Sequence, residues 1–140
     1  MKFLPDVNVL FPLLVSRHSH RAAAVEWFDS TGIAEVALCR LARLGALRLL
    51  CNAVVMGPDV LQPEGALGAL RALEYYERIV CVAEPPGLDR ALEDCVAGCV
   101  STPNFWSDAY LAAFASASLI ELVTFDRGFG KFPHLRFRQL

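Results

Sequence analysis

Three aspartates occupy positions from which they could share one metal ion. Asp6 and Asp126 each follow a short apolar segment that predicts a strand, and Asp108 lies in a helical pattern. In an open α/β sheet, ligands bind beyond the carboxyl ends of the strands. Clustered carboxylates repel one another unless a cation neutralises them, and their oxygens suit Mg²⁺ or Mn²⁺. The three acids therefore predict a metal-dependent phosphodiester hydrolase.

Each aspartate also has an ordinary structural explanation. A single Asp at the end of a strand, such as Asp126, is most often a turn or capping residue. Asp108 alone fits a surface or capping carboxylate. Asp6 is harder to explain in this way, because it interrupts a strongly apolar segment. The ordered set of three favours one shared site over three unrelated roles.

The apolar periodicity places strands and helices in alternation. Strands are expected at residues 2–5, 35–39, 79–83, 121–125 and 135–138, and helices at residues 8–16, 22–29, 41–50, 64–77, 88–97 and 105–118. The 79–83 strand is expected to be buried, and residues 52–63 to be a connection. This alternation predicts a parallel sheet flanked by helices, within a single domain that spans residues 1–140.

The composition excludes several classes of protein. The chain of 140 residues is 55% hydrophobic and 20% charged, which is typical of a compact globular protein and not of a disordered one. Its net charge of −2 excludes a strongly basic nucleic-acid binder, so any contact with nucleic acid is expected to be local and based on arginine. No apolar run is long enough to cross a membrane, and the N-terminus does not resemble a signal peptide. We expect a cytoplasmic protein.

The five cysteines do not form a metal-binding pattern. Cys39, Cys51 and Cys81 lie in apolar surroundings, and Cys95 and Cys99 are four residues apart in a helical segment. No second Cys or His pair has a matching spacing. We expect these cysteines to be buried and reduced.

The three acidic segments together resemble a known family. In order along the chain they read Phe3-Leu-Pro-Asp6-Val-Asn8, Trp106-Ser-Asp108-Ala-Tyr and Leu122-Val-Thr-Phe-Asp126-Arg-Gly. This order and separation resemble the PIN-domain ribonucleases, and most of all the VapC-type toxins of bacterial toxin–antitoxin pairs. The resemblance covers nearly the whole chain. It implies a PIN-like three-layer α/β/α sandwich and an endoribonuclease that cuts single-stranded RNA or RNA loops.

The same resemblance implies roles for particular residues. Asp6, Asp108 and Asp126 correspond to the catalytic acids that hold one or two Mg²⁺ or Mn²⁺ ions in the family. Asn8 matches a polar position beside the first acid, and Ser107 matches a hydroxyl residue that precedes the third acid.

Two further polar residues lie next to these acids. Asn104 is one helical turn before Asp108, so it either orients that acid or caps the helix. Arg127 follows Asp126 and either faces an RNA phosphate or lies in a solvated turn.

The resemblance also implies two protein partners, a small antitoxin and a second copy of the chain. We expect the antitoxin to lay a helix or an extended tail into an apolar groove between the N-terminal helices and residues 64–77. A basic antitoxin side chain is expected near the acids, where it would replace the charge of the metal.

One position departs from the family pattern. Family members usually have a glutamate early in the helix that follows the second strand, and this chain has Arg43 there. Glu35 starts that strand and therefore lies at its wrong end. In the same segment, Leu41, Leu44 and Leu47, with Arg48 as a further position, recur at the three-to-four-residue spacing of a helix.

An arginine among the acids would either weaken metal binding or clamp a phosphate in a bidentate geometry. The resemblance therefore implies a ribonuclease that Arg43 weakens. The alternative is a catalytically inactive PIN-fold module that retains antitoxin or RNA binding.

A third hypothesis is a phosphatase of the haloacid-dehalogenase type, because Asp6-Val-Asn8 resembles an aspartate nucleophile segment. Such a site needs a second Asp as its acid/base, and Asn8 cannot act in that way, so this hypothesis is disfavoured. The remaining candidate side chains are expected to lie at the surface or at helix starts (His18, His20, His134), or to pack in the core or an interface rather than stack on bases (Trp27, Phe28, Trp106).

Overall fold

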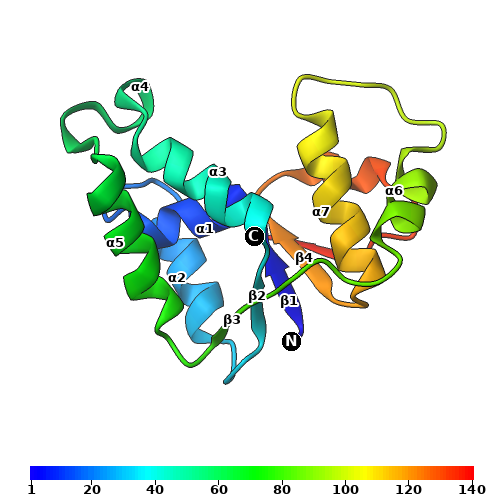
Figure 1. Ribbon diagram of the computed structural model, residues 1–140, viewed down its shortest axis with the longest axis horizontal. Coiled ribbons are helices and arrows are strands. Elements are labelled where there is room, and N and C mark those ends of the chain that lie inside the picture. Colours follow the sequence, from blue (N-terminus) through cyan, green and yellow to red (C-terminus); the bar gives the residue numbers. More distant parts are fainter.

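The computed structural model describes residues 1–140 and contains a five-stranded parallel sheet at its centre (Figure 1). The strands are β1 (Phe3–Pro5), β2 (Val36–Leu38), β3 (Ile79–Cys81), β4 (Glu121–Thr124) and β5 (Phe137–Gln139). Their spatial order is β3-β2-β1-β4-β5, and every neighbouring pair is parallel. The carboxyl ends of all five strands therefore lie along one edge of the sheet.

Seven helices cover the sheet. They are α1 (Val7–Leu14), α2 (Arg21–Asp29), α3 (Arg40–Leu50), α4 (Ala53–Met56), α5 (Pro63–Glu74), α6 (Leu88–Val96) and α7 (Phe105–Ala117), with two 3₁₀ turns, η1 (Gly57–Asp59) and η2 (Arg127–Lys131). Figure 1 shows α1 to α5 on one side of the sheet and α6 and α7 on the other. The predicted three-layer α/β/α arrangement is confirmed.

None of these helices alone has the length and apolar character needed to cross a membrane. The bent pair Arg40–Leu50 and Ala53–Asp59 has that length and character only when its two members are counted together.

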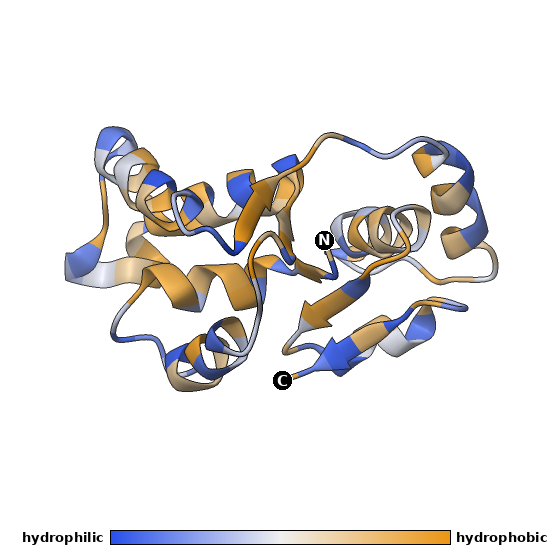
Figure 2. Ribbon diagram, turned by 90° about the horizontal axis from the view of Figure 1, so that it is seen from below, coloured by the Kyte–Doolittle hydropathy of each residue, from blue (hydrophilic) through white to orange (hydrophobic).

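The core forms on both faces of the three central strands. All three residues of β2 are buried, as are Leu4 in β1 and Leu122 and Val123 in β4. Figure 2 shows apolar residues along these strands. Strands that are buried on both faces carry continuous apolar runs instead of an alternating pattern. This is the reason why the short apolar segments of the sequence predict these strands correctly.

A glycine lets α1 and α3 approach closely beside the end of β1. A Cβ atom on Gly45 of α3 would lie 2.6 Å from Cγ2 of Val7, a distance that real Cβ atoms do not tolerate. The buried residues of α3 include the small side chains of Ala42 and Ala46. Leu44 is 54% exposed. The helix expected at residues 41–50 is present, and small residues form its contact face.

Three other expectations differ from the structure. Residues 52–63 contain α4, which Asn52 caps through its side chain, and the turn η1. The β3 strand is only partly buried, because it lies at an edge of the sheet. Cys51 and Cys81 are exposed, whereas Cys39 and Cys95 are buried as expected.

Candidate active site

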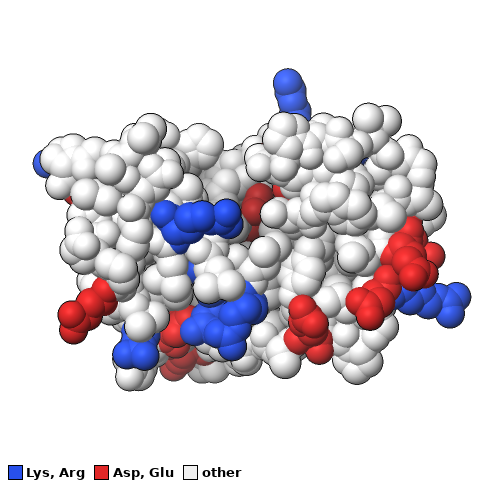
Figure 3. Space-filling view, turned by 45° about the horizontal axis from the view of Figure 1, so that its top comes forward, with Lys and Arg blue, Asp and Glu red and all other residues white.

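The three predicted aspartates line one hollow of about 430 Å³, between α3 and α7. Asn8, Asn104 and Ser107 also line it. Asp6 follows β1 and Asp126 follows β4, and these two strands are neighbours in the sheet. Figure 3 shows acidic side chains recessed between the two halves of the molecule, with basic side chains near the rim of the hollow. The sheet order thus brings together acids that are far apart in the sequence.

Asp6 joins the first strand to the first helix. Its Oδ1 accepts a hydrogen bond of 2.6 Å from the backbone N–H of Val7, so it caps the N-terminus of α1. Its Oδ2 accepts a bond of 2.9 Å from the hydroxyl of Thr124. Capping by Asp stabilises a helix start, and the helix dipole favours a negative charge there. These bonds hold the carboxylate in one orientation.

Burial dominates the electrostatics of Asp6. Only 8% of the residue is exposed. The pKa of its carboxyl is raised from the ordinary 3.8 to about 6, chiefly by burial; the bonds from Thr124 and Val7 oppose this shift, and the charges of Asp108 and Asp126 add to it. The charged form of Asp6 is therefore disfavoured unless a cation enters the hollow.

Thr124 was not predicted from the sequence, yet it connects the acids. It is fully buried on β4, and its hydroxyl oxygen accepts bonds from Nδ2 of Asn8 at 3.1 Å and from the backbone N–H of Asp126 at 3.0 Å. The Oδ1 of Asn8 accepts a bond from the backbone N–H of Phe125. One hydroxyl and one amide thus link the ends of β1 and β4. The available signal was a threonine inside an apolar strand, two residues before an acid.

Asp108 and Asp126 are held less tightly than Asp6. Asp108 lies in the first turn of α7, and its Oδ2 lies 3.5 Å from Nζ of Lys131. Burial raises the pKa of Asp108, Lys131 lowers it and Asp126 raises it. Asp126 is exposed and accepts a bond of 2.7 Å from the backbone N–H of Gly128. The sequence did not identify Lys131 as a partner of these acids.

The expectation that Arg43 approaches the acids was wrong. Its Nε lies 2.5 Å from Oε1 of Glu74 on α5, and it does not line the hollow. Arg48 of the same helix lines the hollow instead. The two arginines are five residues apart, which places them about 140° apart around an α-helix. Helix α3 contains no acidic residue, so it provides no fourth carboxylate.

The remaining polar candidates have separate positions. Asn104 lines the hollow, but its side chain makes no capping hydrogen bond to α7. Arg127 is exposed and does not line the hollow. Trp27 and Phe28 are buried in the core as expected, and Trp106 is 63% exposed.

The carboxylates suit a hydrated hard cation by their chemistry, but they do not form a closed set of direct ligands. No three His, Cys, Asp or Glu side chains are grouped closely enough to hold one ion. Mg²⁺ usually keeps several waters and uses only one or two carboxylates. An oxygen-only donor set with excess negative charge fits that mode of binding.

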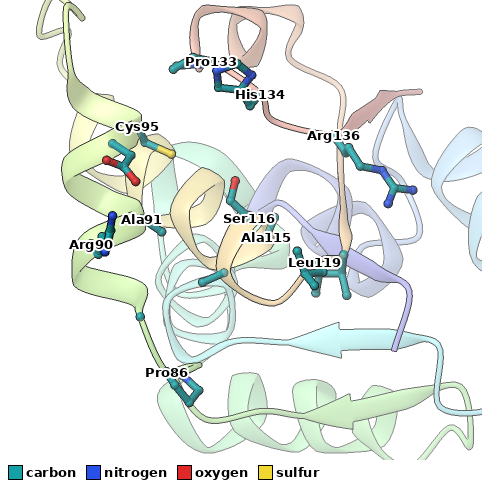
Figure 4. A pocket seen from close by; sticks show the side chains of 14 residues that line it. Pro86, Arg90, Ala91, Cys95, Ala115, Ser116, Leu119, Pro133, His134 and Arg136 are labelled. Atoms are coloured by element: carbon teal, nitrogen blue, oxygen red, sulfur yellow. The ribbon is translucent and has the colours of Figure 1, made fainter.

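A larger hollow of about 550 Å³ lies away from the acids, between α6, α7 and the loop before β5 (Figure 4). Arg90, Arg136 and His134 line it, with Asp94 as its one carboxylate. It contains none of the predicted site residues. The smaller hollow, which the three aspartates line, is therefore the candidate active site.

Comparison with known proteins gives a relative of nearly the same length. No protein-family model matches the chain. The chain is 36% identical to Ribonuclease VapC41 of Mycobacterium tuberculosis over an alignment of 143 residues, which covers 98% of this chain and 97% of that protein.

Two solved structures share the fold at low sequence identity. VapBC2 from Rickettsia felis, bound to a DNA fragment from its promoter, has a TM-score of 0.71 at 13% identity and covers 99% of this chain and 98% of its own. The sarcin–ricin-loop-cleaving toxin VapC20 of M. tuberculosis has a TM-score of 0.68 at 15% identity and covers 96% of this chain and 99% of its own.

The raised pKa of Asp6 predicts a pH-dependent stability in metal-free buffer. The native pKa of about 6 exceeds the ordinary value of 3.8, so the contribution of Asp6 is most favourable below pH 3.8 and is lost as the pH rises through 6. Relative to Asp6→Asn, the wild type should lose about 2–3 kcal/mol across this window, at 1.4 kcal/mol per pKa unit. Thermal unfolding with a chelator present measures the difference.

Asn also caps helices well, so the variant should remain folded. Parallel stability–pH curves for the two proteins would contradict the assignment of buried, uncompensated charge to Asp6.

Proposed function

The chain belongs to the VapC family of PIN-domain ribonucleases, and we propose that it is a Mg²⁺- or Mn²⁺-dependent endoribonuclease, the toxin of a type II toxin–antitoxin pair. The observation that carries this proposal is the convergence of Asp6, Asp108 and Asp126 on one hollow. The near full-length identity to Ribonuclease VapC41 supports it. The proposed substrate is single-stranded RNA or an RNA loop, and the proposed location is the cytoplasm.

The three carboxylates would hold a hydrated Mg²⁺ or Mn²⁺ ion. Such an ion, when bound, lowers the pKa of water and stabilises negative charge on a phosphodiester. Other groups of the chain position these carboxylates. Thr124 and the N-terminus of α1 fix the orientation of the Asp6 carboxylate, and Asn8 ties this point to the end of β4. Lys131 restrains Asp108 through a salt bridge.

Arg48 supplies the positive charge that was expected from Arg43. It lines the acidic hollow and makes no salt bridge within the chain. A guanidinium group binds phosphate oxygens in a bidentate manner. We therefore assign it to the phosphate of the RNA strand. The alternative was an inactive binding module, favoured by Arg43 at the usual glutamate position. Arg43 pairs with Glu74 instead of approaching the acids, which supports the active enzyme.

A hollow of about 510 Å³ between α1, α2 and α5 is the proposed antitoxin site. It lies where the apolar groove was expected. Leu13, Leu14, Val25 and Phe28 line one side, and Ala69, Ala72, Leu73 and Tyr76 line the other. An amphipathic helix binds such a groove through its apolar face. Several structural neighbours are VapBC complexes, which supports a small protein as the occupant.

We also propose that two copies of the chain associate. Val54 and Tyr75 are 95% and 88% exposed, so large apolar side chains are available at the surface for such a contact.

Replacing each acid with its amide should abolish RNA cleavage. Asp6→Asn, Asp108→Asn and Asp126→Asn each remove one metal-binding charge while keeping a similar shape, so cleavage of single-stranded RNA with Mg²⁺ or Mn²⁺ should fall to background. The matched control is Asp94→Asn on exposed α6, which should cleave as the wild type does. Circular dichroism checks that all variants are folded. Unchanged cleavage by Asp6→Asn would rule out the proposed mechanism.

The two arginines of α3 should give opposite phenotypes. Arg48→Gln should raise the KM for RNA roughly tenfold, the value of one hydrogen bond to a charged group, and should leave the Tm unchanged. Arg43→Gln should lower the Tm, because Glu74 loses its partner, and should leave the KM unchanged. Steady-state cleavage and thermal unfolding of both variants test this. The reverse pattern would contradict this assignment and indicate that Arg43, not Arg48, contacts the RNA.

An arginine in the apolar groove should block the antitoxin. Ala72 is an exposed residue of α5 that lines the groove, so Ala72→Arg should preserve the fold but prevent a partner helix from seating. A tagged wild-type chain from the native host should co-purify with a small protein, and the variant should not. Ala97→Arg, at the exposed end of α6, is the control. A wild-type chain that purifies alone under gentle lysis would contradict the proposal.

A further inference from the structure

A second hollow adjoins the acidic one. It measures about 490 Å³, within the range of ligand pockets, and shares Asn8, Leu49 and Asp126 with the acidic hollow. Because the two hollows share three lining residues, a strand that places a phosphate at the acids brings a neighbouring group close to this second hollow.

Four aromatic rings form its wall. Phe11, His18, His20 and Phe125 all line the hollow. Their rings contact one another in series: Phe11 to His18 at 5.4 Å, His18 to His20 at 5.6 Å, and His20 to Phe125 at 4.2 Å between centroids. Each contact is edge-to-face, the preferred geometry of aromatic pairs. The wall therefore joins α1, the loop before α2 and the end of β4.

The wall offers a hydrogen-bond donor at His18. The Nδ1 of His18 accepts a bond of 3.0 Å from the backbone N–H of His20. Neutral His18 must then carry its proton on Nε2. Burial, followed by the charge of His20, lowers the pKa of His18, which keeps this ring neutral at pH 7. Flat rings and one ring N–H suit a flat, uncharged ligand that has hydrogen-bond acceptors.

We propose that this hollow is a nucleobase subsite, which receives the base of a nucleotide next to the cleaved phosphodiester. This inference rests on the proposed ribonuclease function. RNA-binding proteins hold unpaired bases by stacking them on Phe and His rings. A base in a duplex is stacked and paired and cannot enter a side hollow without leaving the helix. The hollow therefore selects a nucleotide whose base is turned out of a single strand or loop.

The chain has three histidines, which makes a direct binding test possible. His18 and His20 line the hollow, and His134 lies at the remote hollow of Figure 4. The variants His18→Asn, His20→Asn and His134→Asn assign the three ring Hε1 resonances by proton NMR. Asn keeps a side-chain acceptor for the His20 N–H and tolerates the positive φ of His134.

The binding probes are AMP, GMP, CMP and UMP, with ribose 5-phosphate as the base-free control, at constant pH and with Mg²⁺ present. The nucleotides should shift the His18 and His20 signals saturably and leave His134 unmoved, and ribose 5-phosphate should shift none. Val55→Trp, at a half-exposed residue of the wall, should fill the hollow and abolish the shifts. Equal shifts with ribose 5-phosphate, or no shift up to the solubility limit, would overturn the proposal.

The second experiment is cleavage of a random pool of single-stranded RNA, followed by sequencing of the cut ends. The wild type and His134→Asn should prefer certain bases at one position beside the cut bond. His20→Asn and Val55→Trp should reduce that preference roughly tenfold, the order expected for loss of one stacked base. A preference that survives Val55→Trp would overturn the subsite and leave the ribonuclease function standing. Specific base binding without any RNA cleavage would support the subsite and overturn the function.

Discussion

The burial of one ionisable carboxyl at the junction of β1 and α1 is the constraint on which the site depends. Asp6 must cap the helix and contact Thr124 at the same time, so α1 can begin only where β1 and β4 lie side by side. This geometry takes a negative charge out of water, and two further acids face it. Desolvation disfavours the charged form of a carboxyl. A cation that enters the hollow would reverse this penalty, which couples ligand binding to the stability of the fold.

The sequence was sufficient to predict where the three acids lie in the fold, because their positions follow from local patterns. Apolar runs that are buried on both faces mark β1 and β4, and the acid that ends each run falls on the carboxyl edge of a parallel sheet. Predicting the position of Asp108 required only the correct helical phase of α7. Arg43 was placed near the acids from the family pattern, whereas the phase of α3 directs it towards Glu74 of α5. Leu41, Gly45 and Arg48, spaced by four and three residues, mark the face that lines the hollow.

Contacts between distant segments could not be read from the sequence in the same way. His18 and His20 look like polar residues of a loop, and only the fold brings Phe11 and Phe125 to either end of them. Thr124 is equally unremarkable until Asn8 and Asp126 donate to its hydroxyl. Sheet order determines both clusters, because it makes the end of β4 a neighbour of α1. Side-chain networks of this kind are a consequence of topology, and the sequence around each member does not show which residues are its partners.

Helix α1 takes part in all three surfaces that the proposed function uses. Its start holds Asp6 and Asn8 at the acids, Phe11 begins the aromatic wall, and Leu13 and Leu14 line the antitoxin groove. Eight residues provide these faces because successive side chains are rotated by about 100° around a helix. Pro12 lies inside the helix, and the guanidinium of Arg21 donates to the carbonyl oxygens of Pro12 and Leu13. A partner bound against Leu13 and Leu14 would therefore contact the same short helix that Asp6 caps.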